Sequence, residues 1–245
     1  IILIKKLSNL SNSDLILYSF FLLNGDIYII GLLKNYYIYS DMYTENIRIN
    51  NQISLWLMIM FIIISVMIIV GGLTRLTDSG LSITKWELFS GFLPPLNQNE
   101  WVQYFNQYKK IPEFELQNYE MSMNEFKVIF WWEWVHRFLG RLIGISFLIP
   151  LIYFSFKVKF SKLLNLYFIF ILICFQGFIG WYMVSSGLVD RVDVSHFRLS
   201  LHLVMAFLIL SLIFWNYLKI NINYNVQNKL NIYYPLGFLI LIFLQ

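Results

Sequence analysis

The sequence predicts an all-α polytopic membrane protein: a four-helix transmembrane bundle followed by the start of a fifth helix. Of the 245 residues, 58% are hydrophobic and only 13% are charged, and the mean hydropathy is +0.63. A soluble domain has about 25% charged residues, so this chain has too few charges to solvate a globular surface. Several stretches also have the roughly 20 apolar residues that a helix needs to cross a bilayer.

The first two predicted spans differ in character. Ile53–Gly72 supplies 20 residues without a charge. In the second, the uncharged stretch Leu142–Phe156 is too short to span alone, and we extend it back to about Val128. That extension brings four ionisable residues to membrane depth: Glu133, His136, Arg137 and Arg141.

The later spans are plainer. Leu163–Val189 is uncharged, and Leu199–Leu218 is interrupted only by His202. Leu230–Gln245 is the expected start of a fifth helix, within a segment 221–245 that we interpret as a linker and a truncated helix. Because the chain starts at Ile1 and stops in an apolar run, we expect it to be a piece of a longer protein. Residues 1–50 are interpreted as a targeting or disordered segment without assigned function.

The loop charges predict the orientation of the bundle. The N-terminal segment, the 157–162 loop and the chain after residue 218 hold nine Lys/Arg and four acids, against seven and nine for loops 73–127 and 185–198. The positive-inside rule places the first group in the cytoplasm or matrix and the long loop 73–127 outside. This asymmetry and two intramembrane arginines account for the net charge of +4, so no nucleic-acid partner is indicated.

Glu133 and His136 are three residues apart and therefore share one helix face. Ionisable side chains at membrane depth usually face a bundle interior or one another, and they often mark function. The alternative is a self-neutralising pair of Glu133 and Arg137 near the interface, with arginines that snorkel to the headgroups.

His202 favours a binding role, because its helix and that of His136 both run inward and place the imidazoles at similar depths. Two facing histidines suit the axial ligation of a haem iron. The single cysteine, Cys174, excludes Cys-based zinc sites and iron–sulfur clusters held within the chain. Zinc with Glu133 as an oxygen ligand remains an alternative. Haem propionates need cations, and the candidates are Arg137, Arg141 and, more weakly, Arg75.

Several motifs resemble those of haem A synthases of the mitochondrial and alphaproteobacterial type. The resemblance runs from about Ile53 to Phe214 and rests on GGLTRLTDSGLS at 71–82, Pro94-Pro95, EFK at 125–127, EWVHRFLGR at 133–141 and QGFIGWYMVSSGL at 176–188. It implies the N-terminal half of an eight-helix protein whose two halves each carry a histidine pair. The second pair would lie beyond this chain.

The resemblance also implies an activity: oxidation of the ring D methyl group of haem O to a formyl group, which makes haem A for cytochrome c oxidase assembly. Glu133 would then be the catalytic carboxylate, His136 and His202 the axial ligands of the substrate iron, and haem b the cofactor of the absent half. Implied partners are haem O synthase, oxidase assembly factors and membrane lipid, with homo-oligomers allowed and the electron-transfer partner unassigned. The implied location is the mitochondrial inner membrane, with the N-terminus in the matrix and the first loop in the intermembrane space. A non-catalytic b-type cytochrome or haem carrier is the alternative.

Overall fold

The structure is a computed structural model that describes residues 26–86, 90–190 and 192–221, with side chains from residue 46 onward. It divides into two units, 1–51 and 52–245, and the packing described below lies within the second. In chain order the elements are α3 (Asp26–Leu76), the short 3-10 helix η1 (Ser90–Phe92), α4 (Gln98–Tyr108), α5 (Pro112–Leu116), α6 (Met123–Ser155), α7 (Phe160–Asp190) and α8 (His196–Asn221). The described residues contain no β-strand.

Four helical segments are long and apolar enough to cross a membrane, which confirms the predicted fold class: Asn46–Leu76, Met123–Ser155, Phe160–Val189 and His196–Asn221. Helix α3 starts at Asp26, so it includes residues that the sequence assigned to a targeting or disordered segment. No proline interrupts residues 26–76, and an established helix gains one hydrogen bond for each further residue. The predicted fifth helix lies outside the described residues.

A backbone hydrogen bond that is missing in α6 because of a proline is replaced by a contact from α3. Pro150 lies inside α6 and has no N–H, so the carbonyl of Ser146 one turn earlier loses its helical partner. The Trp56 indole of α3 donates to that carbonyl at 3.1 Å. The Trp56 ring also packs on Phe147 and Phe154. A backbone acceptor that would be unsatisfied in lipid thus becomes an interhelical contact.

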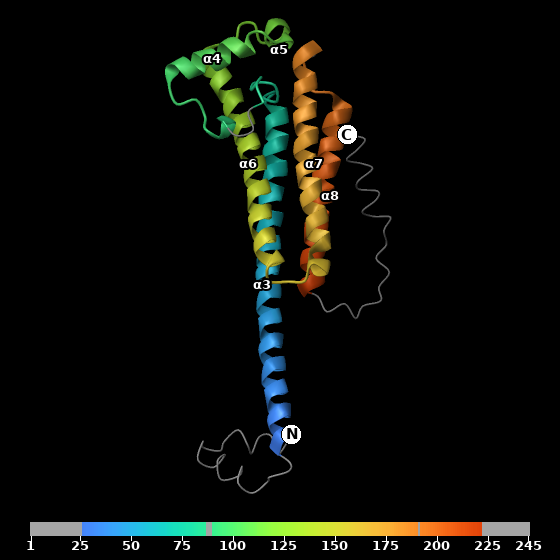
Figure 1. Ribbon diagram of the computed structural model, residues 1–245. Helices are drawn as coiled ribbons and strands as arrows, with labels where there is room; N and C mark the ends of the chain where they lie inside the picture. The colour runs from blue at the N-terminus through green and yellow to red at the C-terminus, as the bar shows by residue number, and fades with distance from the viewer. Residues whose placement is uncertain (1–25, 87–89, 191, 222–245) are drawn as a thin grey trace. The chain divides into compact units, whose positions relative to one another are not determined.

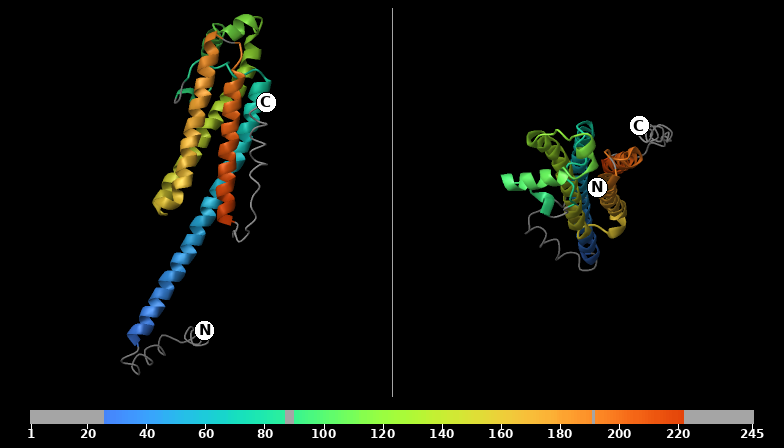
Figure 2. Two further views of the ribbon diagram at one scale, coloured as in Figure 1. Left: turned by 90° about the vertical axis from the view of Figure 1, so that its right-hand side faces the viewer. Right: turned by 90° about the horizontal axis from the view of Figure 1, so that it is seen from above.

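The four long helices form a closed ring of neighbours. They run side by side in both side views (Figures 1 and 2), and a contact between each adjacent pair closes the ring. Besides Trp56 between α3 and α6, these contacts are Ser155–Tyr167 (2.6 Å) for α6–α7, Gln176 with the His202 carbonyl (2.9 Å) for α7–α8, and Asn221–Ser54 (2.7 Å) for α8–α3.

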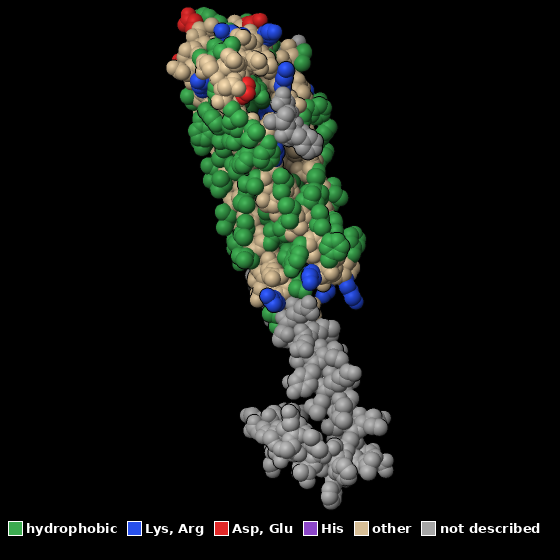
Figure 3. Space-filling model, turned by 60° about the vertical axis from the view of Figure 1, so that its left-hand side comes forward, with side chains coloured by type: hydrophobic (Ala, Val, Ile, Leu, Met, Phe, Trp, Pro, Cys, Tyr) green, Lys and Arg blue, Asp and Glu red, His purple; other side chains and the backbone are tan. Residues whose placement is uncertain are grey.

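The outer surface of the bundle is apolar between two charged ends. Figure 3 shows hydrophobic side chains along the helices, and the acidic side chains in that view lie at the end that carries α4 and α5. The opposite end of the bundle carries Lys157, Lys159, Lys162 and Lys219. This distribution is that of a multi-pass membrane protein.

Helix α3 ends in a Schellman motif. The Asp78 residue adopts φ 48°, the Ser79 N–H bonds to the Thr74 carbonyl at 3.0 Å, and the Asp78 N–H bonds to the Arg75 carbonyl at 3.3 Å. Asp is one of the few side-chain-bearing residues that tolerates this left-handed conformation. The stop turns the chain sharply at the end of the membrane span.

The region predicted as a long outer loop, 73–127, contains two short α-helices and a 3-10 helix. Asn97 caps α4 by accepting from the Glu100 N–H at 2.9 Å, and Pro112 starts α5. Three buried residues recur along α4 with helical spacing: Trp101, Phe105 and Tyr108. They pack on Phe126 and Phe130 at the outer end of α6, and the five side chains belong to one hydrophobic core. We call this region the outer subdomain, residues 77–122.

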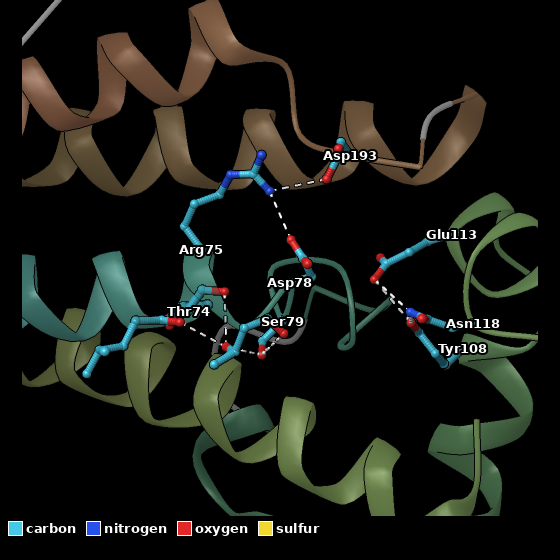
Figure 4. A network of polar contacts seen from close by, with 10 residues as sticks. Thr74, Arg75, Asp78, Ser79, Tyr108, Glu113, Asn118 and Asp193 are labelled. Atoms are coloured by element: carbon cyan, nitrogen blue, oxygen red, sulfur yellow. Dashed lines mark hydrogen bonds and ion pairs between the residues drawn. The ribbon is translucent and has the colours of Figure 1, made fainter. Parts of the chain in front are cut away.

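The outer subdomain buries a carboxyl group. Glu113 is 3% exposed; its Oε1 accepts from the Tyr108 hydroxyl at 3.1 Å and from the Asn118 amide at 3.4 Å (Figure 4). Its Oε2 is buried without a hydrogen-bond partner among the described residues. The pKa of Glu113 is raised to about 8, chiefly by burial and to a smaller extent by the neighbouring acids Glu133, Asp193 and Asp78, while the hydrogen bond from Tyr108 opposes the rise.

We expect the outer subdomain to lose stability as the pH rises from about 4.5 to about 8. Over that range the folded state keeps a proton on Glu113 that the unfolded state has released, so the free energy of unfolding falls with pH. Glu113→Gln mimics the protonated acid and should remove this pH dependence. Limited proteolysis of residues 77–122 in the membrane-embedded protein, at pH 5.5 and pH 8.5, measures it. An unchanged pH dependence in Glu113→Gln would assign the effect to another group.

Candidate functional site

His136 lies on α6 and faces a glycine of α3. A Cβ atom built on Gly71 would lie 3.0 Å from His136 Cε1 and 3.4 Å from Nδ1. The imidazole therefore occupies the space that any larger residue at position 71 would fill. Its Nδ1 atom is buried and has no hydrogen-bond partner among the described residues.

His202 on α8 repeats this arrangement against α7. A Cβ atom on Gly180 would lie 3.1 Å from His202 Cε1, and Nδ1 of His202 is likewise buried without a partner in the described part of the chain. One turn before Gly180, the Gln176 amide donates to the His202 backbone carbonyl at 2.9 Å. Gln176 therefore ties the His202 turn of α8 to α7.

The two histidines lie at comparable distances along their helices from the basic end of the bundle. His136 precedes Lys157 by 21 residues, and His202 precedes Lys219 by 17. These separations correspond to about 31 and about 26 Å of helix rise from the basic end of the bundle. Counted along their helices, both histidines therefore lie far from the basic end of the bundle.

Glu133 is the centre of a buried polar network that attaches the outer subdomain to α6. Its carboxylate is 3% exposed. The Ser82 hydroxyl and the Ile83 N–H each donate to Oε2 at 2.7 Å, while Arg137 donates to Oε1 through Nε at 3.0 Å and Nη2 at 2.5 Å. Both carboxylate oxygens are thus bound by protein donors. The predicted alternative of a Glu133–Arg137 pair is present in the structure, together with contacts that the sequence did not reveal.

Arg137 and Arg141 line one narrow cleft with Lys85 and Trp134. Arg137 also donates to the backbone carbonyls of Ile83 at 2.8 Å and Lys85 at 3.3 Å. Two guanidinium groups therefore lie at the outer end of α6 beside Lys85, where they could receive carboxylates of a bound anion. Lys85 was not predicted, because it stands in a region without a periodic pattern.

Arg75 lies elsewhere. Its Nη1 forms ion pairs with Asp78 and Asp193, both at 3.2 Å (Figure 4). This pairing connects the end of α3 to the segment between α7 and α8. The structure therefore separates Arg75 from the cleft that contains Arg137 and Arg141.

The described side chains contain no group of three or more His, Cys, Asp or Glu that could bind a metal ion. The zinc alternative needed Glu133 as a ligand, and that carboxylate is occupied by Ser82, Ile83 and Arg137. Paired histidines without a third ligand suit a haem iron better, because the porphyrin supplies the equatorial nitrogens. The two unpartnered Nδ1 atoms leave both imidazoles free of competing protein hydrogen bonds at that atom.

Fold and site together define a polytopic helical membrane protein that holds two half-buried histidines on separate transmembrane helices. The family model described as "Cytochrome oxidase assembly protein" matches residues 54–245. The chain belongs to that family.

Several curated relatives carry the name "Heme A synthase". The chain is 53% identical over 213 residues to the one from Pelagibacter ubique, covering 85% of this chain and 61% of the relative. It is 50% identical to the one from Maricaulis maris, covering 68% and 49%, and 49% identical to the one from Rickettsia bellii, covering 67% and 49%. The chain thus spans between about half and three fifths of the length of these relatives. No solved structure gives a significant match.

Proposed function

We propose that this chain forms the substrate half of a haem A synthase, which oxidises the ring D methyl group of haem O to a formyl group. The observation that carries the proposal is the pair of half-buried histidines on α6 and α8. Each is set against a glycine, and the buried Nδ1 atom of each has no hydrogen-bond partner among the described residues. About 50% identity to proteins named "Heme A synthase" supports it.

Haem O would be bound through His136 and His202 as axial ligands of its iron. Gly71 and Gly180 leave room for the imidazoles, because neither position carries a side chain. Arg141 and Arg137, joined by Lys85 in the same cleft, would bind the propionates. Arg75 is a weaker candidate for that role because two carboxylates already pair with it.

Glu133 is proposed as the carboxylate that assists the reaction. Conversion of a methyl to a formyl group removes four electrons, which an electron acceptor outside this chain must take, and adds one oxygen atom, which water would supply. Loss of electrons develops positive charge on the methyl carbon, and a nearby carboxylate would stabilise that charge or accept a proton from the carbon. In the structure the carboxylate is held by Ser82, Ile83 and Arg137. For Glu133 to take part in the reaction, its carboxylate must release one of these hydrogen bonds and contact the substrate instead. If it keeps all of them, Glu133 acts only by holding the residues of the cleft in place and is not a catalytic residue.

The proposal extends to location and partners. We propose the mitochondrial inner membrane, with the lysine-rich end of the bundle in the matrix and the outer subdomain in the intermembrane space. Residues 51–220 would be the haem-binding half, and a haem b would lie in the other half, outside this chain. Haem O synthase would supply the substrate and oxidase assembly factors would receive the product, within surrounding lipid and with a homo-oligomer allowed.

The test is haem content and turnover of the full-length, solubilised protein. We expect the wild type to convert haem O into haem A, His202→Ala to lose bound haem O, and Glu133→Gln to retain haem O without making haem A. Ser82→Ala, which keeps the carboxylate and removes one of its donors, is the matched control and should keep activity. A Glu133→Gln variant that makes haem A at the normal rate would refute the catalytic role. Haem b alone in the wild type, with no conversion, would refute the proposed reaction and favour a cytochrome.

A further inference from the structure

The chain around the 3-10 helix η1, ahead of α4, exposes large apolar side chains although it belongs to the charged outer part of the chain. Leu93 is 66% exposed, Phe92 is 36% exposed and the preceding Trp86 is 45% exposed. Contiguous exposed apolar side chains commonly mark an interaction site. Their neighbour Pro95 is buried, so the segment is anchored to the protein while these side chains stay partly exposed.

Contacts with α6 give the depth of this segment. The Phe92 ring lies 5.3 Å from the Phe138 ring, edge to face, and the Arg141 guanidinium lies 5.9 Å from the Phe92 ring. Phe138 precedes Lys157 by 19 residues, which is about 28 Å of helix. A bilayer core is roughly 30 Å thick. Phe92 and Leu93 therefore lie at the outer boundary of the hydrocarbon, and the headgroups lie just above them.

The chemistry of the segment fits that boundary. Trp and other apolar rings with nearby cations are characteristic of the membrane–water interface, and Arg137 stacks on Trp86 with its Cζ 5.4 Å from the ring centroid. The helices also expose many apolar side chains, and Figure 3 shows such side chains along one face of the bundle. A water-soluble protein partner would have to enter the bilayer to contact these side chains, so lipid is the occupant that the depth favours.

We propose that Trp86, Phe92 and Leu93 form an interfacial anchor that inserts into the outer leaflet and contacts lipid acyl chains. The anchor holds the outer subdomain on the bilayer, and Leu93 also lines the cleft of Arg137 and Arg141. The inference rests on membrane embedding, and its test does not measure the proposed reaction.

Spin labels distinguish lipid from water at chosen positions in the full chain reconstituted in phosphatidylcholine vesicles. Cys174 is the only cysteine of the sequence, so a Cys174→Ser background permits single labels at Leu93→Cys and Leu116→Cys. Leu116 is the matched control: it is also a leucine, is 71% exposed, and lies in α5, at the far outer end of the bundle (Figure 1). Both labelled proteins must elute as the unlabelled protein does.

We expect the ratio of collisions with oxygen to collisions with a water-soluble nickel chelate to be several-fold higher at position 93 than at position 116. Equal ratios would overturn the proposal, because they would place Leu93 in water. Protection of position 93 from both reagents would also overturn it, because it would indicate a second copy or another protein covering the patch.

Discussion

Glu133→Gln is expected to lower the free energy of unfolding by about 3–5 kcal/mol, the usual cost of removing one partner from a buried ion pair. The carboxylate receives donors from Ser82, Ile83 and Arg137 at 2.5 to 3.0 Å. Glutamine has one carbonyl oxygen, so its amide group must face either Arg137 or the Ile83 N–H, both of which are donors. The Arg137 guanidinium, with its side chain 10% exposed, would then lack its counter-charge.

A double-mutant cycle isolates the pair. Arg137→Met alone should also destabilise, because it leaves Glu133 charged and buried, whereas Glu133→Gln with Arg137→Met should cost less than the sum of the two single changes. Ser82→Ala should cost only about 1 kcal/mol, as expected for one neutral hydrogen bond. Denaturant titration of the protein in mixed micelles measures all four variants. Strict additivity would show that Glu133 and Arg137 do not stabilise the fold through each other.

Gly71→Ala and Gly180→Ala are expected to destabilise the protein and to displace the imidazoles that face them. The added Cβ would lie 3.0 Å from His136 Cε1 at position 71 and 3.1 Å from His202 Cε1 at position 180. Overpacking of this kind costs about 1–3 kcal/mol. Because the neighbours in question are the proposed axial ligands, bound haem should show a shifted Soret band or lower occupancy.

Two neighbouring glycines provide controls on the same helices. A Cβ on Gly72 or Gly177 meets nothing within 4 Å, so Gly72→Ala and Gly177→Ala should stabilise their helices by up to about 1 kcal/mol. Thermal unfolding and the absorbance spectrum of the haem-loaded protein compare the four variants. If Gly71→Ala behaved like Gly72→Ala in both measurements, the imidazole would not be held against α3.

The chemistry-bearing residues could largely be predicted, but their partners could not. Intramembrane charges are rare enough that Glu133, His136, Arg137 and His202 are conspicuous in an apolar sequence. The Ser82 hydroxyl and the Ile83 N–H are ordinary groups of a loop, and they become partners of Glu133 because the chain returns to α6 some 50 residues away in sequence. Gln176 was present in a family motif, yet its contact with the His202 carbonyl depends on the packing of α7 on α8.

The outer subdomain shows the same division. The residue types in 77–122 suggested a loop, because short amphipathic helices have no long apolar run, and their stability comes from burial of Trp101, Phe105 and Tyr108 against α6.

The sequence by itself determined the membrane-spanning helices, since transfer of about 20 apolar residues into lipid is a property of each segment alone. The tertiary structure alone decided which glycine faces each histidine, which carbonyl receives the Trp56 indole, and that Arg75 pairs with Asp193 rather than joining Arg137. These contacts depend on the rotation of one helix against another, which is set by the packing of all four helices together.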